Sequence, residues 1–163
     1  MSNKDQKIIS RLLDNAKKSE LNQKLAAAIY CGNKLLSLNI NSHRNKFGKE
    51  IKSSGHCEIA CLYDIFPEIF KANLTNYVSP RTKFKPNNLT LYVVRYLKTG
   101  KNYCGHSAPC VNCTEKIKRS GIKKIVYIDE NCNIIKKQVK NYNSNFITSG
   151  YRTYSRNNVS VPS

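Results

Sequence analysis

Residues 107–113 read SAPCVNC, and residues 55–59, much earlier in the chain, read GHCEI. Together the two stretches spell H-x-E, a long interval and P-C-x-x-C. His56, Cys110 and Cys113 offer an imidazole and two thiolates, a set of ligands that suits zinc. Because three protein ligands leave the fourth tetrahedral position of zinc to water, the sequence predicts a catalytic Zn2+ site with these residues as ligands.

Glu58 follows His56 by two positions, inside a segment that is expected to be helical. Side chains at positions i and i+2 of a helix point in different directions, so the carboxylate can lie beside the water without binding the metal. Zinc lowers the pKa of its water towards neutrality, and a neighbouring carboxylate can then carry the proton. Glu58 is therefore the predicted catalytic residue.

A structural zinc site is the alternative interpretation of the same cysteines. Such a site needs a fourth ligand, which Cys104 or His106 could supply, and it has no use for Glu58. A single C-x-x-C can also be half of a zinc knuckle or a redox pair. Cys57 and Cys61, one helical turn apart, could form a metal-binding pair, but that arrangement would leave out the H-x-E motif. The cysteines outside the metal motif are expected to be reduced thiols.

In this order and on predicted helix starts, the two half-motifs resemble the signature of the zinc-dependent nucleobase deaminases, and in particular of the cytidine and deoxycytidylate deaminases. The resemblance extends over most of the chain, from about residue 24 to about residue 140. It implies hydrolysis of a cytosine base to uracil with release of ammonia, and Zn2+ as the cofactor. It also implies that a backbone carbonyl just before the P-C pair, at Ser107 or Ala108, helps to hold the amino group of the base.

The same resemblance implies that an Asn at the end of the second strand touches the sugar or base of the substrate. Asn41 falls at the matching place, and Asn39 lies two residues away on the same strand face. An Asn that merely ends the strand is the alternative. The polar loop over 42–54 leads into the metal-binding helix, so His43 and Arg44 are candidates for phosphate or base contacts, with a solvated basic loop as the alternative.

Hydrophobic periodicity and turn residues predict an α/β fold. The expected elements are helices over 5–21, 56–66 and 110–120, a β-hairpin over 24–40, and strands over 89–96, 122–128 and 134–139. Ser53 or Ser54 is expected to cap the second helix, and Gly121 to end the third. Together with the resemblance, this order predicts a three-layer α/β/α cytidine deaminase-like fold with a mixed five-stranded sheet.

The last two strands are separated only by residues 129–133. A parallel neighbour needs a crossover of about a dozen residues or more, so the sequence predicts a C-terminal antiparallel hairpin. In the resembling families, free-nucleoside cytidine deaminases use a hairpin here but bind zinc through C-x-E and P-C-G-x-C. Deoxycytidylate deaminases, tRNA adenosine deaminases and APOBEC/AID proteins place a helix there. The chain combines features of both groups, which leaves its substrate open.

At 163 residues the chain fits one domain. Its expected parts are an N-terminal amphipathic helix over 1–23 packed on the domain, a deaminase domain over 24–140, and a polar basic tail over 141–163. No apolar run approaches the roughly 20 residues of a membrane span, and the N-terminus has no signal-peptide core. We therefore expect no membrane partner and a cytoplasmic location; the nucleus or the cytosol of a virus-infected host, and a homo-oligomer, agree with the same sequence.

The charge is strongly positive, with Lys+Arg 28 against Asp+Glu 10 and a formal net charge of +18. Such an excess favours an anionic partner: nucleic acid, a nucleotide or a membrane surface. Of these, a cytosine nucleotide and single-stranded nucleic acid are the expected partners. Drift towards the Lys, Asn and Ile codons of an AT-rich genome is the alternative explanation.

The predicted function is zinc-dependent hydrolytic deamination of cytosine in a nucleoside, a nucleotide or a nucleic-acid strand, which belongs to nucleotide metabolism or to nucleic-acid editing. Two alternatives remain at this point. One is a tRNA-type deaminase that converts adenosine to inosine. The other is a catalytically idle, zinc-stabilised nucleic-acid-binding module, against which the intact Glu58 argues.

Overall fold

The computed structural model describes residues 3–43, 46–47, 50–51, 56–70 and 88–144. Its helices and strands are α1 (Asn3–Ala16), β1 (Lys24–Cys31), β2 (Lys34–Ile40), β3 (Lys46–Phe47), β4 (Glu50–Ile51), α2 (Cys57–Ile65), β5 (Leu89–Tyr96), β6 (Cys104–Gly105), α3 (Val111–Ser120), β7 (Lys124–Ile128) and β8 (Ile134–Gln138). None of the helices in these ranges is long and apolar enough to cross a membrane.

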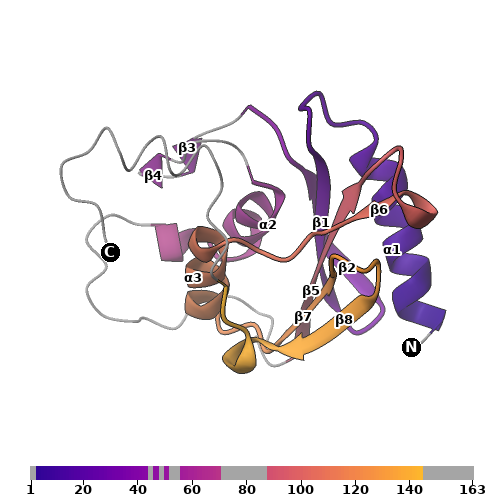
Figure 1. The fold of residues 1–163 in the computed structure, drawn as a ribbon. Helices are drawn as coiled ribbons and strands as arrows, with labels where there is room; N and C mark the ends of the chain where they lie inside the picture. The colour runs from indigo at the N-terminus through magenta and orange to yellow at the C-terminus, as the bar shows by residue number, and fades with distance from the viewer. Residues whose placement is uncertain (1–2, 44–45, 48–49, 52–55, 71–87, 145–163) are drawn as a thin grey trace.

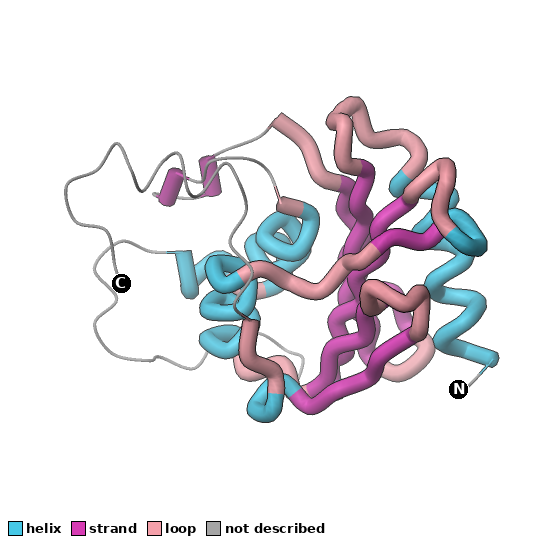
Figure 2. The backbone as a smooth tube through the Cα atoms, in the orientation of Figure 1, coloured by secondary structure: helices cyan, strands magenta, loops and turns pink. Residues whose placement is uncertain are grey.

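The main sheet has the strand order β2-β1-β5-β7-β8, and the short β6 also pairs with β5. Among the strands that the structure describes, the β5–β7 pair is parallel and the other pairs of this sheet are antiparallel. Helix α1 covers one face of this sheet, and α2 and α3 lie together over the other (Figures 1 and 2). The predicted mixed α/β fold with three layers is thus confirmed. The sheet has a sixth strand, β6, which was not among the predicted strands.

The C-terminal hairpin is confirmed by the register of β7 and β8, which runs antiparallel from Lys124↔Gln138 to Ile128↔Ile134. Its turn is closed by Asp129, whose carboxylate accepts hydrogen bonds from the backbone N–H groups of Asn131 and Asn133 at 2.9 and 2.8 Å. The turn therefore has no room for a crossover helix between these strands.

Helix α1 packs on β1 and β5 through an apolar stripe consisting of Ile8, Ile9, Leu12 and Ala16. The helix ends at Ala16, whereas the sequence predicted an end at residue 21. Beyond Ala16, the amides of Lys18 and Ser19 donate to carbonyls three residues earlier, which tightens the chain out of the α-helix. The buried Ser19 hydroxyl then donates to the backbone of Asn41, so this segment is bound to the end of β2 instead.

Asp5 fixes the first turn of α1 against the sheet. Its carboxylate is buried, accepts a 2.6 Å hydrogen bond from the Tyr92 hydroxyl, and lies 3.5 Å from the Lys136 amine. Burial, with the hydrogen bond to Asp5, raises the pKa of Tyr92, so this hydroxyl stays protonated and continues to donate. One side chain thereby joins α1, β5 and β8.

Replacing Asp5 with Ala is expected to lower the free energy of unfolding by about 1–3 kcal/mol, because the buried Tyr92 hydroxyl loses its acceptor. Asp14 offers a control on the same helix: it is exposed and forms only a 3.9 Å surface pair with Lys17. Asp14→Ala should change the stability by less than about 0.5 kcal/mol. Urea unfolding of both variants measures the difference, and equal effects would show that the contact of Asp5 with Tyr92 contributes nothing.

The other face of the sheet carries the main core, where apolar side chains of β1, β5 and β7 meet those of α2 and α3. Its fully buried members include Ile29, Ile59, Leu62, Leu91 and Ile117. Gly121 ends α3 in the left-handed conformation at φ 80°, as predicted, which turns the chain back towards β7. This packing sets the N-termini of α2 and α3 beside each other.

Candidate active site

Two helix N-termini converge on this site. His56 is the N-cap residue of α2 and Cys110 is the N-cap residue of α3, and both have extended backbone conformations. The Cys110 sulfur accepts a 3.5 Å hydrogen bond from the backbone N–H of Cys113. The expectation that Ser53 or Ser54 caps α2 is wrong: His56 holds that position, and the two serines lie outside the described residues.

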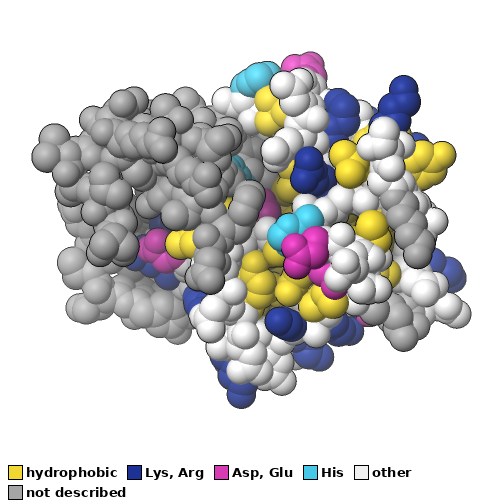
Figure 3. Space-filling model, viewed as in Figure 1, with side chains coloured by type: hydrophobic (Ala, Val, Ile, Leu, Met, Phe, Trp, Pro, Cys, Tyr) yellow, Lys and Arg dark blue, Asp and Glu magenta, His cyan; other side chains and the backbone are white. Residues whose placement is uncertain are grey.

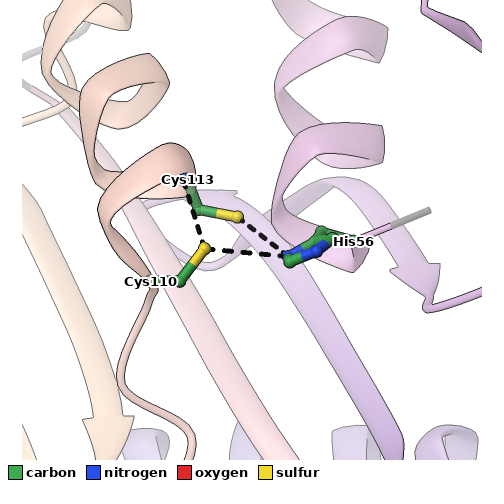
Figure 4. Close-up of side chains that lie close together, drawn as sticks. All are labelled: His56, Cys110 and Cys113. Atoms are coloured by element: carbon green, nitrogen blue, oxygen red, sulfur yellow. Dashed lines mark hydrogen bonds between the residues drawn. The ribbon is translucent and has the colours of Figure 1, made fainter. Parts of the chain in front are cut away.

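His56, Cys110 and Cys113 lie close enough to hold one metal ion, with their ligand atoms all within 4.8 Å of one another (Figure 4). The Nδ1 atom of His56 lies 3.3 Å from the Cys113 sulfur and 3.9 Å from the Cys110 sulfur. A tetrahedral zinc with Zn–S of about 2.3 Å and Zn–N of about 2.0–2.1 Å would place such a nitrogen about 3.6 Å from each sulfur. The observed distances lie on both sides of this value, so the three residues fit zinc.

The pKa values of the two cysteine thiols are shifted in opposite directions. The hydrogen bond from the Cys113 thiol, with a smaller effect from His56, lowers the pKa of Cys110 to about 4. Cys113 donates that bond and is fully buried, and both effects raise its pKa well above the usual value. Together the sulfurs therefore hold one negative charge at neutral pH. A divalent cation bound between them would stabilise the second thiolate, since coordinated cysteines lose their protons.

Glu58 lies in the first turn of α2, only 4% exposed. Burial raises the pKa of its carboxyl group; the charge of His56 opposes this rise, and that of Cys110 adds to it. None of the ion pairs among the described residues involves Glu58. Its carboxylate accepts a 3.5 Å contact from the neighbouring Cys57 thiol. A buried carboxyl group beside metal-ligating side chains and outside these ion pairs is a candidate for proton transfer.

The residues of the two alternative metal sites, a fourth ligand at Cys104 or His106 and a Cys57–Cys61 pair, lie outside the cluster. The Cys104 thiol faces the carbonyl of Asn102 at 3.5 Å, and the Cys61 thiol donates to the carbonyl of Ala27 at 3.3 Å. His106 is exposed on the surface. Within the described ranges, the cluster of possible metal ligands comprises His56 and the two cysteines of α3, without a fourth member.

Asn41 lies at the end of β2 and is buried, with its side chain bonded to the backbone. Its carbonyl oxygen accepts from the N–H of Leu25 at 3.0 Å, and its amide nitrogen donates to the carbonyl of Gln23 at 2.6 Å. Asn39 instead faces α2 and donates to the Asp64 carboxylate at 2.9 Å. The structure thus gives Asn41 a role in closing the hairpin, and its contact with substrate stays a prediction.

Ser107 joins β5 to β7 just before the metal-binding cysteines. Its hydroxyl donates to the carbonyl of Val93 and accepts from the N–H of Ile128, both at 2.8 Å, and its own N–H donates to the carbonyl of Ile128 at 2.9 Å. These bonds fix the backbone where a carbonyl of Ser107 or the half-buried Ala108 was predicted to meet the substrate. His43 is exposed just past the end of β2, and Arg44 lies outside the described residues.

Tyr142 is a site residue that the sequence did not reveal, since it lies in the segment predicted to be a polar tail. It is buried, packs edge-on against Tyr127 at 5.5 Å, and donates a 2.7 Å hydrogen bond to the carbonyl of Pro109. Burial raises the pKa of Tyr142 to about 12, so it remains a donor at neutral pH. It therefore supports the backbone directly before Cys110.

No family model matches this sequence, and no curated protein matches it. Among solved structures, the chain is similar to the 1.6 Å crystal structure of cytidine deaminase from Burkholderia pseudomallei, with a TM-score of 0.52 and 16% sequence identity. The match covers 85% of this chain and 94% of that chain. It shows that the two proteins share a fold, which agrees with the fold that the two half-motifs predicted.

Proposed function

We propose that this protein is a zinc-dependent hydrolytic deaminase that converts a cytosine base to uracil and releases ammonia. One observation carries the proposal: the side chains of His56, Cys110 and Cys113 meet at two helix N-termini, and the buried Glu58 lies in the first turn of one of these helices. A binding module stabilised by zinc would need the ligands but not the buried carboxyl group.

The three ligands would hold the zinc ion, which when bound supplies a Lewis acid that makes a water molecule acidic near neutral pH. Glu58 would take the two protons of this water in turn, and would deliver one to N3 of the base and the other to the departing amino group. The water oxygen becomes the new carbonyl oxygen at C4, and the amino group leaves as ammonia. Burial raises the pKa of Glu58, which moves the carboxyl group towards the range in which accepting and returning a proton are both favourable.

The antiparallel β7–β8 hairpin supports cytosine over adenine as the base. In the families that the motifs resemble, this arrangement belongs to the free-nucleoside cytidine deaminases, whereas tRNA adenosine deaminases, like deoxycytidylate deaminases and APOBEC/AID proteins, place a helix between the last two strands. The His ligand is shared with this second group, so the hairpin favours cytosine without deciding whether the substrate carries a phosphate. The register from Lys124↔Gln138 to Ile128↔Ile134 shows that β7 and β8 run antiparallel.

Mass spectrometry of the products tests the proposal directly. The zinc-loaded protein is incubated with cytidine, deoxycytidine, dCMP, dCTP and single-stranded DNA and RNA, and with adenosine and AMP as the contrasting set. We expect uracil products and equimolar ammonia from at least one cytosine substrate. Inosine products alone would transfer the proposal to adenine, and no product from either set would favour the idle zinc-binding module.

A further inference from the structure

Arg95 lies near the end of β5 on the face of the sheet that carries the candidate active site. Alternate side chains of β5 belong to opposite faces, and Leu91 and Val93 pack in the same core as the metal-binding cysteines. Arg95, two residues after Val93, shares their face. Across the sheet it pairs with Leu25 of β1 on one side and Gly105 of β6 on the other.

Helix α2 and strand β2 run in opposite directions, which sets the level of the metal ligands relative to the sheet. Asp64 accepts from both Ser37 and Asn39, and the Cys61 sulfur, nearly one turn earlier, lies 3.5 Å from the amide nitrogen of Asn39. His56 precedes Cys61 by five residues, about 7.5 Å along a helix axis.

Asn41 follows Asn39 by two residues, about 6.8 Å along a strand. His56 and Asn41 therefore lie at nearly the same level. Asn41 is bonded to Leu25, and Leu25 pairs with Arg95. Asn41, Leu25 and Arg95 therefore form a row of neighbours across β2, β1 and β5. This row crosses the sheet at the level of the metal ligands.

One N–H donor of the Arg95 guanidinium group has no acceptor among the described residues. Its Nε atom is buried without a hydrogen-bond partner, and none of the ion pairs among the described residues involves Arg95. A guanidinium is always charged and offers five N–H donors in a planar fork. A buried donor without an acceptor costs free energy, which an anionic ligand would offset.

Gly105 makes room for the side chain of Arg95. A Cβ atom at Gly105 would lie 3.2 Å from the Cδ atom of Arg95 and 3.4 Å from its Cγ atom. The arginine stem therefore lies against β6, whose chain continues directly into the segment that ends at Cys110. Lys and Arg side chains appear at several separate places on the face shown in Figure 3, so they do not gather in a single patch there.

We propose that Arg95 binds a phosphate group of the substrate, so that the site selects a phosphate-bearing cytosine nucleotide over the free nucleoside. This inference rests on the proposed deaminase function. The planar fork of the guanidinium matches two phosphate oxygens. The phosphate can belong to a mononucleotide or to a nucleic-acid strand, and the two sources are separated by the substrates used in the test.

The test compares the zinc-loaded wild-type protein with Arg95→Gln, using deoxycytidine, dCMP and an oligodeoxynucleotide that contains a single cytosine. Arg95→Gln is expected to lower kcat/KM for a phosphate-bearing substrate by about 10- to 100-fold, because a charge-assisted contact is lost. The kcat/KM for deoxycytidine, which has no phosphate, should stay within about 2-fold of the wild-type value. A loss confined to dCMP identifies a mononucleotide as the ligand, and one confined to the oligonucleotide identifies a strand phosphate.

Arg11→Gln serves as the control, because Arg11 is exposed on α1, on the opposite face of the sheet, and its loss removes the same charge. Arg11→Gln should leave kcat/KM for all three substrates within about 2-fold of the wild-type values. Gly105→Ala keeps the guanidinium group of Arg95 but displaces the stem of its side chain. It should lower kcat/KM for the same substrates as Arg95→Gln. An equal fall for deoxycytidine and the phosphate-bearing substrates in folded Arg95→Gln would overturn the inference.

Calorimetric binding of dCMP and of the oligonucleotide to Glu58→Gln protein, with and without Arg95→Gln, separates this inference from the proposed function. Arg95-dependent binding of either ligand without any wild-type turnover would refute the deaminase function and keep the phosphate site. Turnover of deoxycytidine together with binding that ignores Arg95 would keep the function and refute the phosphate site. If the protein bound neither dCMP nor the oligonucleotide, the phosphate site would also be refuted.

Discussion

Glu58→Gln is expected to lower kcat by about 10²- to 10⁴-fold on whichever cytosine substrate proves active, because the amide cannot accept and return the proton. Gln keeps the size of the side chain, so fold and zinc content should be unchanged. The burial of Glu58, at 4% exposure, means that bulk water cannot easily take over this transfer. Steady-state kinetics and metal analysis on the same preparation measure both quantities.

Glu115→Gln is the control for this variant, since Glu115 is exposed on α3 and pairs only with Arg119 at the surface. It should retain full activity. If Glu58→Gln kept near-normal deamination, Glu58 would have no part in the chemistry. If it lost zinc as well as activity, the carboxyl group would be holding the metal site together and the kinetic loss would say nothing about proton transfer.

Cys113→Ala is expected to abolish zinc binding, from one ion per chain to a trace, and with it all activity. His56 and Cys110 would remain as two ligands, one fewer than the three protein ligands that an open catalytic zinc site uses. The zinc-loaded wild type should also unfold at a higher temperature than the same protein after chelation, because metal that binds the folded state stabilises it by mass action. Inductively coupled plasma spectrometry and thermal unfolding follow the two effects.

Cys104→Ala and Cys57→Ala provide the controls for the ligand set. Cys104 faces the carbonyl of Asn102, and the Cys57 thiol lies 3.5 Å from the Glu58 carboxylate, so neither is part of the cluster. Both variants should keep one zinc per chain. Loss of zinc from either one would mean that the ligand set proposed for this site is wrong.

Patterns among neighbouring residues in the sequence correctly predicted the helix and strand ends that depend on those neighbours alone. The richness of residues 89–96 in β-branched and aromatic side chains predicted β5 over Leu89–Tyr96, with both ends correct. A glycine that favours positive φ predicted the end of α3 at Gly121. The short link between the last strands predicted the β7–β8 hairpin, because chain length alone excludes a crossover.

Contacts between distant segments could not be predicted in this way. Ser107 bridges β5 and β7 only because the chain returns between those strands after β6. Tyr142 supports the backbone of Pro109 across 33 residues of sequence, and nothing near Tyr142 marks it as buried. Arg95 looks like an ordinary strand residue until the sheet places it in a row with Asn41. Each of these roles depends on tertiary packing rather than on periodicity.

The antiparallel hairpin also affects how this protein meets copies of itself. In the part of the chain that the structure describes, β8 is an outer strand of the sheet, and its Lys136 and Lys137 are exposed. An outer strand offers unpaired backbone groups to any extended chain, and lysines on it discourage such pairing. A second molecule presenting its own β8 would meet like charges. This edge is therefore protected against strand-to-strand aggregation, and the protection should weaken as salt screens the lysines.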